Sequence, residues 1–85
     1  MTFFDFMMRY IQKDSPAGDL ARDMLEDEAH FPDTNNSDDI MQYLISRRAC
    51  SECLRTFKTC YKRYELHEHK QKQDYIHDEA DNNIN

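Results

Sequence analysis

The chain has 85 residues and a formal net charge of −6, with one glycine, two prolines and three cysteines. A domain of this length leaves little room for a ligand pocket, which usually occupies on the order of hundreds of Å³, so its size argues against an enzyme. The negative charge disfavours general nucleic-acid binding, because the phosphates would meet a repulsive field.

Apolar residues fall into four helix-length groups, and the absence of valine also favours helices over strands. The first predicted helix follows Thr2, a residue that can cap its N-terminus, and covers the apolar segment 3–11. The second predicted helix has Ser15 as its N-cap and Pro16 as its first helical residue. Each of these helix starts has a side chain that can accept a hydrogen bond from a backbone amide of the first helical turn, followed by residues with an apolar helical pattern.

The second helix should end near Glu28, because the residue before Pro32 disfavours helical geometry. We expect Phe31, in the loop that follows, to fill part of the core. Ser37 is the predicted N-cap of the third helix, and the fourth helix should begin near Cys50 or Ser51.

The fourth helix carries a stripe of apolar residues at alternating spacings of three and four. Its members are Cys50, Cys53, Leu54, Phe57, Cys60, Tyr61, Tyr64 and His67. This pattern weakens after Leu66, so we predict a helical domain over residues 1–65 and a charged helical extension beyond it. From Asp78 onward the extension should be disordered, because too few apolar residues remain to offset the entropy of ordering.

Several residues together carry a family resemblance. They are Phe3, Phe4, Arg9, Tyr10, the run Gly18-Asp19-Leu20-Ala21, Asp27, Phe31, Pro32, Ile40, Tyr43, Leu44, Phe57, Tyr61 and Tyr64. Over about residues 2–65 the chain resembles the YozE SAM-like family, small proteins of Gram-positive bacteria and their phages. The resemblance implies an all-α bundle of four to five helices, and it implies no activity and no catalytic residues. Family members generally end near Glu65, so segment 66–85 is an addition of this chain.

Opposite charges are separated along the sequence, with nine acidic residues and one arginine in segment 14–39 and six basic residues and one glutamate in segment 47–63. We predict an acidic partner-binding face made of Asp19, Asp23, Glu26, Asp27, Asp38 and Asp39. We predict a basic partner-binding face made of Arg47, Arg48, Arg55, Lys58 and Lys62. The alternative interpretation is two solvated helix surfaces of opposite sign.

These features favour a non-enzymatic module that binds another protein, either a second copy or a different chain. By analogy with other SAM-like domains, the acidic face of one copy would contact the basic face of the next. The contact would join Asp23, Asp27 and Asp39 to Arg55, Lys58 and Lys62. Head-to-tail contacts of this kind need not close, so filaments are one expected outcome.

Two other functions compete with this interpretation. The acidic residues, with Asp33 added, could mimic phosphates and inhibit a host enzyme that processes nucleic acid. The basic segment 47–63 could instead bind nucleic acid directly, although the net charge and the lack of interleaved exposed aromatic residues argue against it. The first alternative would suit a protein encoded by a phage or mobile element.

The three cysteines do not form a pattern typical of a metal site. Cys50, Cys53 and Cys60 would spread over roughly 15 Å of one helix, too far for a single ion to bind all three. They coincide with the apolar stripe, so we expect them to fill the core as free thiols. No metal, cofactor or nucleophile with its base is predicted.

The N-terminal segment lacks the pattern of a signal peptide, and no apolar run approaches the roughly 20 residues that span a bilayer. With an odd number of cysteines, we expect a cytoplasmic protein with reduced thiols and no membrane contact. The first and third predicted helices carry more apolar surface than a small bundle can hide. Met8 and Ile45 are the residues we expect to mark any exposed apolar patch.

Overall fold

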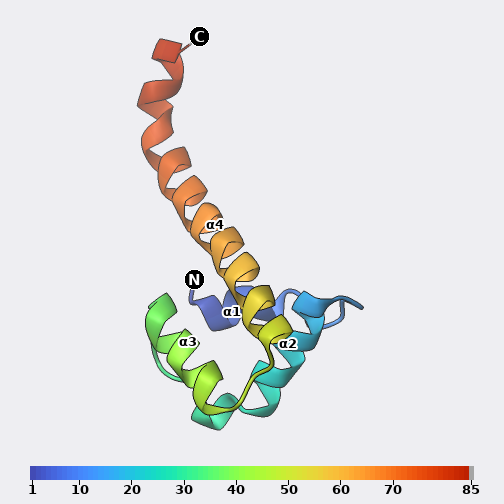
Figure 1. The fold of residues 1–85 in the computed structure, drawn as a ribbon. Coiled ribbons are helices and arrows are strands. Elements are labelled where there is room, and N and C mark those ends of the chain that lie inside the picture. The colour runs from blue at the N-terminus through green and yellow to red at the C-terminus, as the bar shows by residue number, and fades with distance from the viewer. Residues whose placement is uncertain (85) are drawn as a thin grey trace.

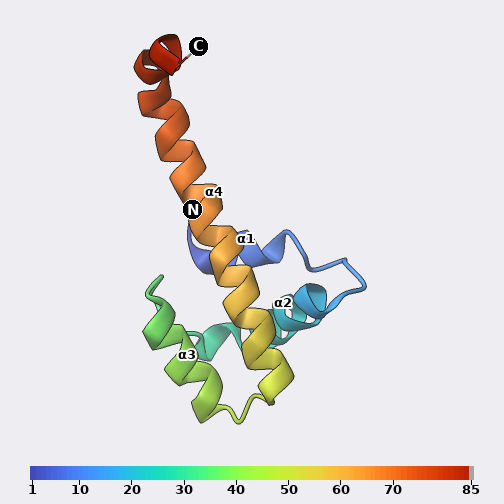
Figure 2. The same ribbon diagram turned by 45° about the horizontal axis from the view of Figure 1, so that its top comes forward.

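The computed structural model describes the backbone of residues 1–84 and the side chains of residues 1–69. The element order is α1 (Phe3–Met8), α2 (Pro16–Glu26), a 3₁₀ helix (Glu28–His30), α3 (Ser37–Ser46) and α4 (Ser51–Ile84). The described part of the chain contains no strand, and its four α-helices confirm the predicted all-α bundle. The first half of α4 packs against α1, α2 and α3, and its second half projects away from them (Figures 1 and 2).

The helix starts follow the capping signals in the sequence, with one exception. The Thr2 hydroxyl accepts from the Asp5 amide at 3.0 Å, and the Ser15 hydroxyl accepts from the Gly18 amide at 3.2 Å, as predicted. The predicted cap of α3 is wrong: Asn36 is the N-cap, and its side chain accepts from the Asp39 amide at 3.1 Å. Asparagine and serine cap equally well, so the sequence alone does not distinguish these two adjacent residues.

The core is built around one aromatic side chain, Phe3, which is 0% exposed. Its ring centroid lies 5.5 Å from Phe57, 5.4 Å from Tyr61 and 5.5 Å from Tyr64 on α4. All four helices contribute the remaining core residues: Phe6, Met7, Ala17, Leu20, Ala21, Met24, Ile40, Leu44 and Cys60. The predicted apolar stripe of α4 is therefore confirmed at its central positions.

Phe31 lies at the edge of this core, in the loop where the sequence places it. Its half-buried ring packs between Phe4, at 5.4 Å, and Tyr43, at 5.2 Å between centroids. It links α1 to α3 across the loop.

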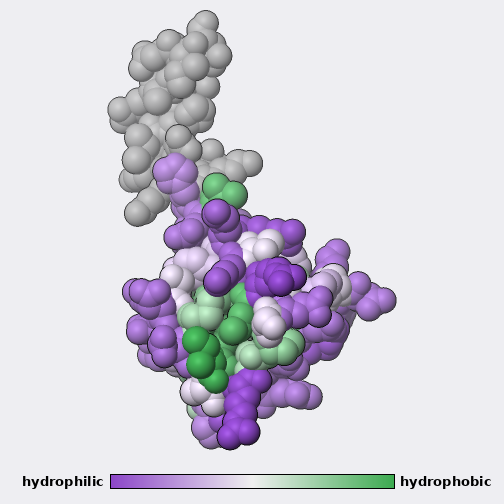
Figure 3. Space-filling view, viewed as in Figure 1, coloured by the Kyte–Doolittle hydropathy of each residue, from purple (hydrophilic) through white to green (hydrophobic). Residues whose placement is uncertain are grey.

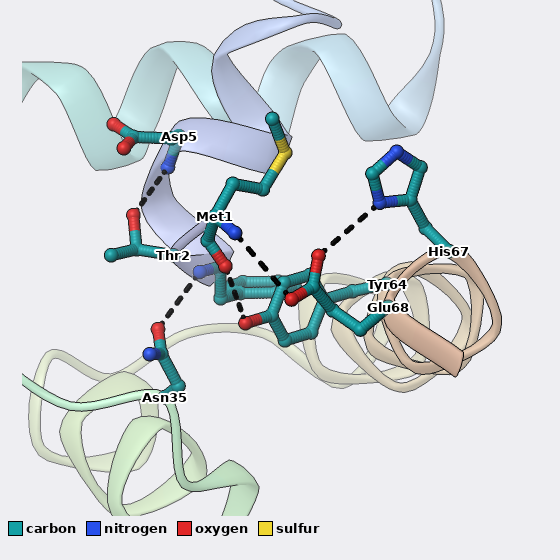
Figure 4. A network of polar contacts seen from close by, with 8 residues as sticks. Met1, Thr2, Asp5, Asn35, Tyr64, His67 and Glu68 are labelled. Carbon is teal, nitrogen blue, oxygen red and sulfur yellow. Dashed lines mark hydrogen bonds and ion pairs between the residues drawn. The ribbon is translucent and has the colours of Figure 1, made fainter. Parts of the chain in front are cut away.

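The start of the chain is fastened to α4 by polar contacts (Figure 4). The Tyr64 hydroxyl donates to the Met1 carbonyl at 2.7 Å, and the Met1 ammonium lies 3.4 Å from a Glu68 carboxylate oxygen. The ring of His67 packs against Phe6 with centroids 5.5 Å apart. Because His67 and Glu68 follow the predicted domain end at residue 65, the contacts of the bundle reach beyond that boundary.

The backbone of α4 is one continuous helix from Ser51 to Ile84. The sequence predicts a helical extension after residue 65 and a disordered segment over 78–85. The helix through Ile84 differs from the predicted disorder, and Asn85 lies outside the described residues. No glycine or proline follows Pro32, so no residue interrupts helical geometry in this part of the chain.

The segment that joins α1 to α2 lies close to α2, because Gly18 leaves space for it and Arg22 binds it. Gly18 is buried, and a Cβ atom at this position would overlap the Lys13 carbonyl oxygen and lie 3.0 Å from the Tyr10 carbonyl oxygen. The Arg22 guanidinium donates to the carbonyls of Ile11 at 2.9 Å and Lys13 at 3.2 Å. The backbone of the connecting segment therefore lies directly on α2.

Helix α3 ends in a Schellman motif. The Ala49 amide donates to the Leu44 carbonyl at 3.0 Å, and the Arg48 amide donates to the Ile45 carbonyl at 2.9 Å. Arg48 has a φ of 63°, the left-handed conformation that glycine adopts most easily at this position.

Replacing Arg48 with glycine should therefore stabilise the fold. Relief of the left-handed strain is worth about 1 kcal/mol, partly offset by the greater freedom of glycine in the unfolded chain. The midpoint of urea unfolding checks this expectation. Arg48→Ala is the control, because alanine keeps the strain and should leave the midpoint nearly unchanged. A lower midpoint for Arg48→Gly than for wild type would contradict it.

Candidate interaction surface

The residues predicted as acidic and basic faces do not form two separate surfaces. Asp19, Asp23 and Glu26 lie on α2, whereas Asp38 and Asp39 lie at the start of α3. Several of these carboxylates already have partners: Asp19 lies 2.5 Å from the Arg22 guanidinium, and Asp39 accepts from Thr34 at 3.2 Å. The predicted basic residues extend from the end of α3 along α4.

Asp27 connects the two predicted faces within one molecule. Its carboxylate accepts from Arg47 at 2.7 Å, lies 3.0 Å from the His30 ring nitrogen, and also accepts from the Tyr43 hydroxyl. The hydrogen bond from Tyr43 is the main cause that holds the pKa of Asp27 below its ordinary value of 3.8. Asp27 and Arg47, assigned to opposite binding faces from the sequence, are therefore bonded to each other.

This polar network borders an open groove of about 460 Å³ between the end of α2, the end of α3 and the start of α4. The residues that line the groove are Leu20, Asp23, Met24, Glu26, Asp27, Tyr43, Leu44, Arg47, Ala49, Cys50 and Cys53. Sequence reasoning missed the network. Tyr43 lies on α3 and Arg47, four residues later, is the C-cap of this helix, and this spacing was the available signal that the two side chains lie on the same side.

Tyr43 should make stability depend on pH in the alkaline range. Burial, followed by the hydrogen bond to the Asp27 carboxylate, raises the pKa of Tyr43 from 10.0 to about 12. The folded state therefore holds the Tyr43 proton more tightly than the unfolded chain does. The resulting contribution to the free energy of unfolding is complete below pH 10 and is lost as the pH rises toward 12.

We expect Tyr43→Phe to lower the free energy of unfolding by about 1.5–3 kcal/mol at neutral pH, because a hydrogen bond to the charged Asp27 carboxylate is lost. The free energy of unfolding of the variant should also fall less steeply with rising pH in the alkaline range. Tyr61 and Tyr64 should account for the pH dependence that remains, because burial raises the pKa of each. Urea midpoints measured at neutral and alkaline pH check both effects. An unchanged alkaline slope would show that Tyr43 does not hold its proton in this way.

The three cysteines differ in their surroundings. Cys60 is 1% exposed and fills the core, as predicted, whereas Cys53 is half-buried and Cys50 is exposed. The prediction that all three fill the core is wrong for Cys50, whose sulfur accepts from the Cys53 amide at 3.4 Å at the start of α4. Burial raises the pKa of the Cys53 and Cys60 thiols. Among residues whose side chains the structure describes, no group of three or more His, Cys, Asp or Glu could hold a metal ion.

A second surface lies between α3 and the first half of α4, which run side by side in opposite directions (Figures 1 and 2). Apolar side chains gather on this side of the molecule over these two helices (Figure 3). Ile45 is 49% exposed, and Met41, Leu54 and Tyr61 are partly buried. We call these four residues the α3–α4 face. The expectation of an exposed apolar residue is confirmed for Ile45, whereas Met8 is half-buried.

Beside Ile45 the same face contains an open hollow of about 380 Å³. The residues that line it are Ser37, Asp38, Met41, Phe57, Lys58, Tyr61, Lys62 and Glu65. Three residues of the predicted faces, Asp38, Lys58 and Lys62, therefore meet around one hollow. No described side chain forms an ion pair with Arg55, Lys58 or Lys62 within 4.0 Å.

The sequence match to known proteins agrees with this architecture. Within the described residues, no helix has both the length and the apolar character that crossing a bilayer requires. No curated protein and no solved structure matches the chain. A family described as "YozE SAM-like fold" matches residues 2–66, which include α1, α2, α3 and the part of α4 that packs on them. With most of its length matched, the chain belongs to the YozE SAM-like family.

Proposed function

We propose that this protein is a non-enzymatic module that binds another protein through its α3–α4 face. The observation that carries the proposal is the exposure of Ile45 beside an open, partly apolar hollow. Exposed apolar surface of this kind, bordered by charged residues, is typical of protein-binding sites. Arg55, Lys58 and Lys62 add positive charge along α4 that a partner's carboxylates could neutralise.

The experiment is affinity purification with three forms of the intact chain as bait: wild type, Ile45→Asp and Leu25→Asp. Leu25 is a matched control, because it is 42% exposed and lies on α2, away from the α3–α4 face. A partner that binds wild type and Leu25→Asp but not Ile45→Asp supports the proposal. Equal recovery with all three baits would show that the α3–α4 face does not bind the partner.

Inhibition of a nucleic-acid-processing enzyme through phosphate mimicry stays a prediction. The structure adds no support, because the carboxylate of Asp27 is engaged by Arg47 and Tyr43 and that of Asp19 by Arg22. Charge reversal at Asp23 and Glu26, which have no partner within 4.0 Å among described side chains, would test it. Unchanged inhibition by such a variant would reject mimicry.

We further propose a cytoplasmic location. Its support is the exposed free thiol of Cys50, because exposed thiols persist in reducing compartments. Fractionation of cells that carry the intact chain tests this, and recovery from an oxidising compartment would contradict it.

A further inference from the structure

We propose that Cys50 and Cys53 form a reversible disulfide bond with each other by exchange with low-molecular-weight disulfides such as oxidised glutathione. The two thiols lie at the start of α4, in the same open groove that the network of Asp27, Tyr43 and Arg47 borders. Neither cysteine belongs to the α3–α4 face. This modification site therefore goes beyond the proposed function and does not depend on it.

The first argument is the spacing of the two residues along the backbone. The Cys50 carbonyl accepts from the Leu54 amide at 3.0 Å, so Cys50 takes part in the first turn of α4. Residues three apart in a helical turn have Cα atoms separated by about 5–6 Å. Disulfide bonds form when the Cα atoms lie roughly 4.4–6.8 Å apart, so the backbone can accept this bond without moving.

The second argument is the position of the Cys50 sulfur. Cys50 Sγ accepts from the backbone amide of Cys53 at 3.4 Å, so it already lies against the residue with which it would bond. The amide nitrogen and Sγ of Cys53 are joined through Cα and Cβ of that residue. Rotation of the two side chains between staggered rotamers is therefore sufficient to bring the sulfur atoms together.

The third argument is that the two thiols differ as a two-step exchange requires. Cys50 is exposed and can meet a disulfide from solution, whereas Cys53 is half-buried. Burial, followed by the nearby Cys50 and the Asp23 carboxylate, raises the pKa of Cys53. Because the thiolate is the attacking form, Cys50 reacts first and Cys53 second. Cys60 takes no part, because it is buried and lies about 10 Å further along α4.

The exchange conserves atoms and electrons. The Cys50 thiol loses its proton, and its sulfur attacks one sulfur of oxidised glutathione, so that one glutathione leaves as a thiolate and takes up a proton. The Cys53 thiol then loses its proton, and its sulfur attacks Cys50 Sγ, which breaks the mixed disulfide and releases the second glutathione as a thiol. Two cysteine thiols are oxidised while one glutathione disulfide is reduced. An excess of reduced glutathione reverses both steps, as expected for a transient bond in a reducing compartment.

Mass spectrometry of the intact chain after incubation with oxidised glutathione tests the proposal. We expect wild type to lose two hydrogen atoms and to gain no glutathione, and an excess of reduced glutathione should restore both thiols. After acid quenching and alkylation, trypsin cleaves behind Arg48 and Arg55, so Cys50 and Cys53 stay in one peptide and Cys60 falls in another. The bond should appear in the first peptide, and Cys60 should be alkylated only after unfolding.

Two single-cysteine variants separate the two steps. In Cys53→Ser, a glutathione adduct on Cys50 should be at least about tenfold more abundant than in wild type, because no second thiol displaces it. In Cys50→Ser, the adduct should form about tenfold more slowly than in Cys53→Ser, because the remaining thiol is half-buried. Serine is a favourable N-cap residue, so Cys50→Ser should remain folded, and far-UV circular dichroism checks this.

Three results would overturn the proposal. The first is an adduct on Cys50 that is as abundant in wild type as in Cys53→Ser, which would show that Cys53 does not displace glutathione. The second is a bond from Cys50 to Cys60 or to another chain. The third is persistence of both thiols in an excess of oxidised glutathione. None of these results bears on binding through Ile45, so the proposed function stands or fails by its own experiment.

Discussion

Replacing Gly18 with alanine is expected to destabilise the fold, although the same change within an ordinary helix stabilises it by roughly 0.5–1 kcal/mol. Gly18 lies inside α2, and the added methyl group would overlap the Lys13 carbonyl oxygen and come within 2.9 Å of its carbonyl carbon. The obstacle is backbone, so no side-chain rotation can relieve it. The connecting segment must move, and the two hydrogen bonds from Arg22 lengthen with it.

We expect Gly18→Ala to cost about 1–3 kcal/mol, which lowers Tm by roughly 5–20 °C for a domain of this size. Thermal unfolding followed by far-UV circular dichroism measures the change. Asp23→Ala is the matched control, because this exposed position on the same helix should shift stability by no more than about 0.5 kcal/mol. A Tm for Gly18→Ala at or above wild type would mean that the segment does not lie against α2.

A double-mutant cycle with Arg22→Ala locates the cause of the destabilisation. If the methyl group displaces the segment that Arg22 holds, removing the guanidinium should cost less in the Gly18→Ala background than in wild type. Strictly additive effects would place the strain elsewhere.

Truncating Phe3 to alanine should have the largest effect of any single change considered. The side chain is fully buried and contacts three aromatic rings of α4, so its removal leaves a cavity where α1 meets α4. Such truncations cost about 3–5 kcal/mol, whereas a domain of this size is stabilised by only about 4–13 kcal/mol. We expect a urea midpoint far below that of wild type, or a chain largely unfolded at physiological temperature.

The adjacent residue provides the control for this prediction. Phe4 is half-buried and packs against Phe31 at 5.4 Å, so Phe4→Ala should cost clearly less than Phe3→Ala. Phe3→Leu, which refills most of the cavity, should recover part of the loss. If Phe4→Ala proved the more damaging change, the core would not be centred on Phe3.

Much of the fold could be predicted because its determinants are local. The caps at Thr2 and Ser15 and the apolar stripe around Phe57 each depend on neighbours within one or two helical turns. The sequence also indicated that the third helix carries more apolar residues than the core can bury, and Ile45 is an exposed one of these residues. Periodicity and capping are sufficient for these features.

The arrangement of charges could not be predicted, because it depends on which helices meet. Asp27 and Arg47 are 20 residues apart, and they meet only because α2 and α3 both pack against α4. The role of Gly18 was equally hidden: its position in a helix is ordinary, and the reason for it lies in a segment that precedes α2. Local sequence patterns predict the helices themselves, but they contain little information about which helices contact each other.

The ion pair between Asp27 and Arg47 weakens the electrostatic field of the molecule at long range. Two groups of opposite sign held 2.7 Å apart produce a field that decays much faster than that of either alone, so an approaching molecule senses little of them. Counting charges along the sequence therefore overstates how polarised this protein is. Long-range attraction of a partner depends on the charges that have no ion-pair partner among the described side chains, such as Arg55, Lys58 and Lys62 on α4.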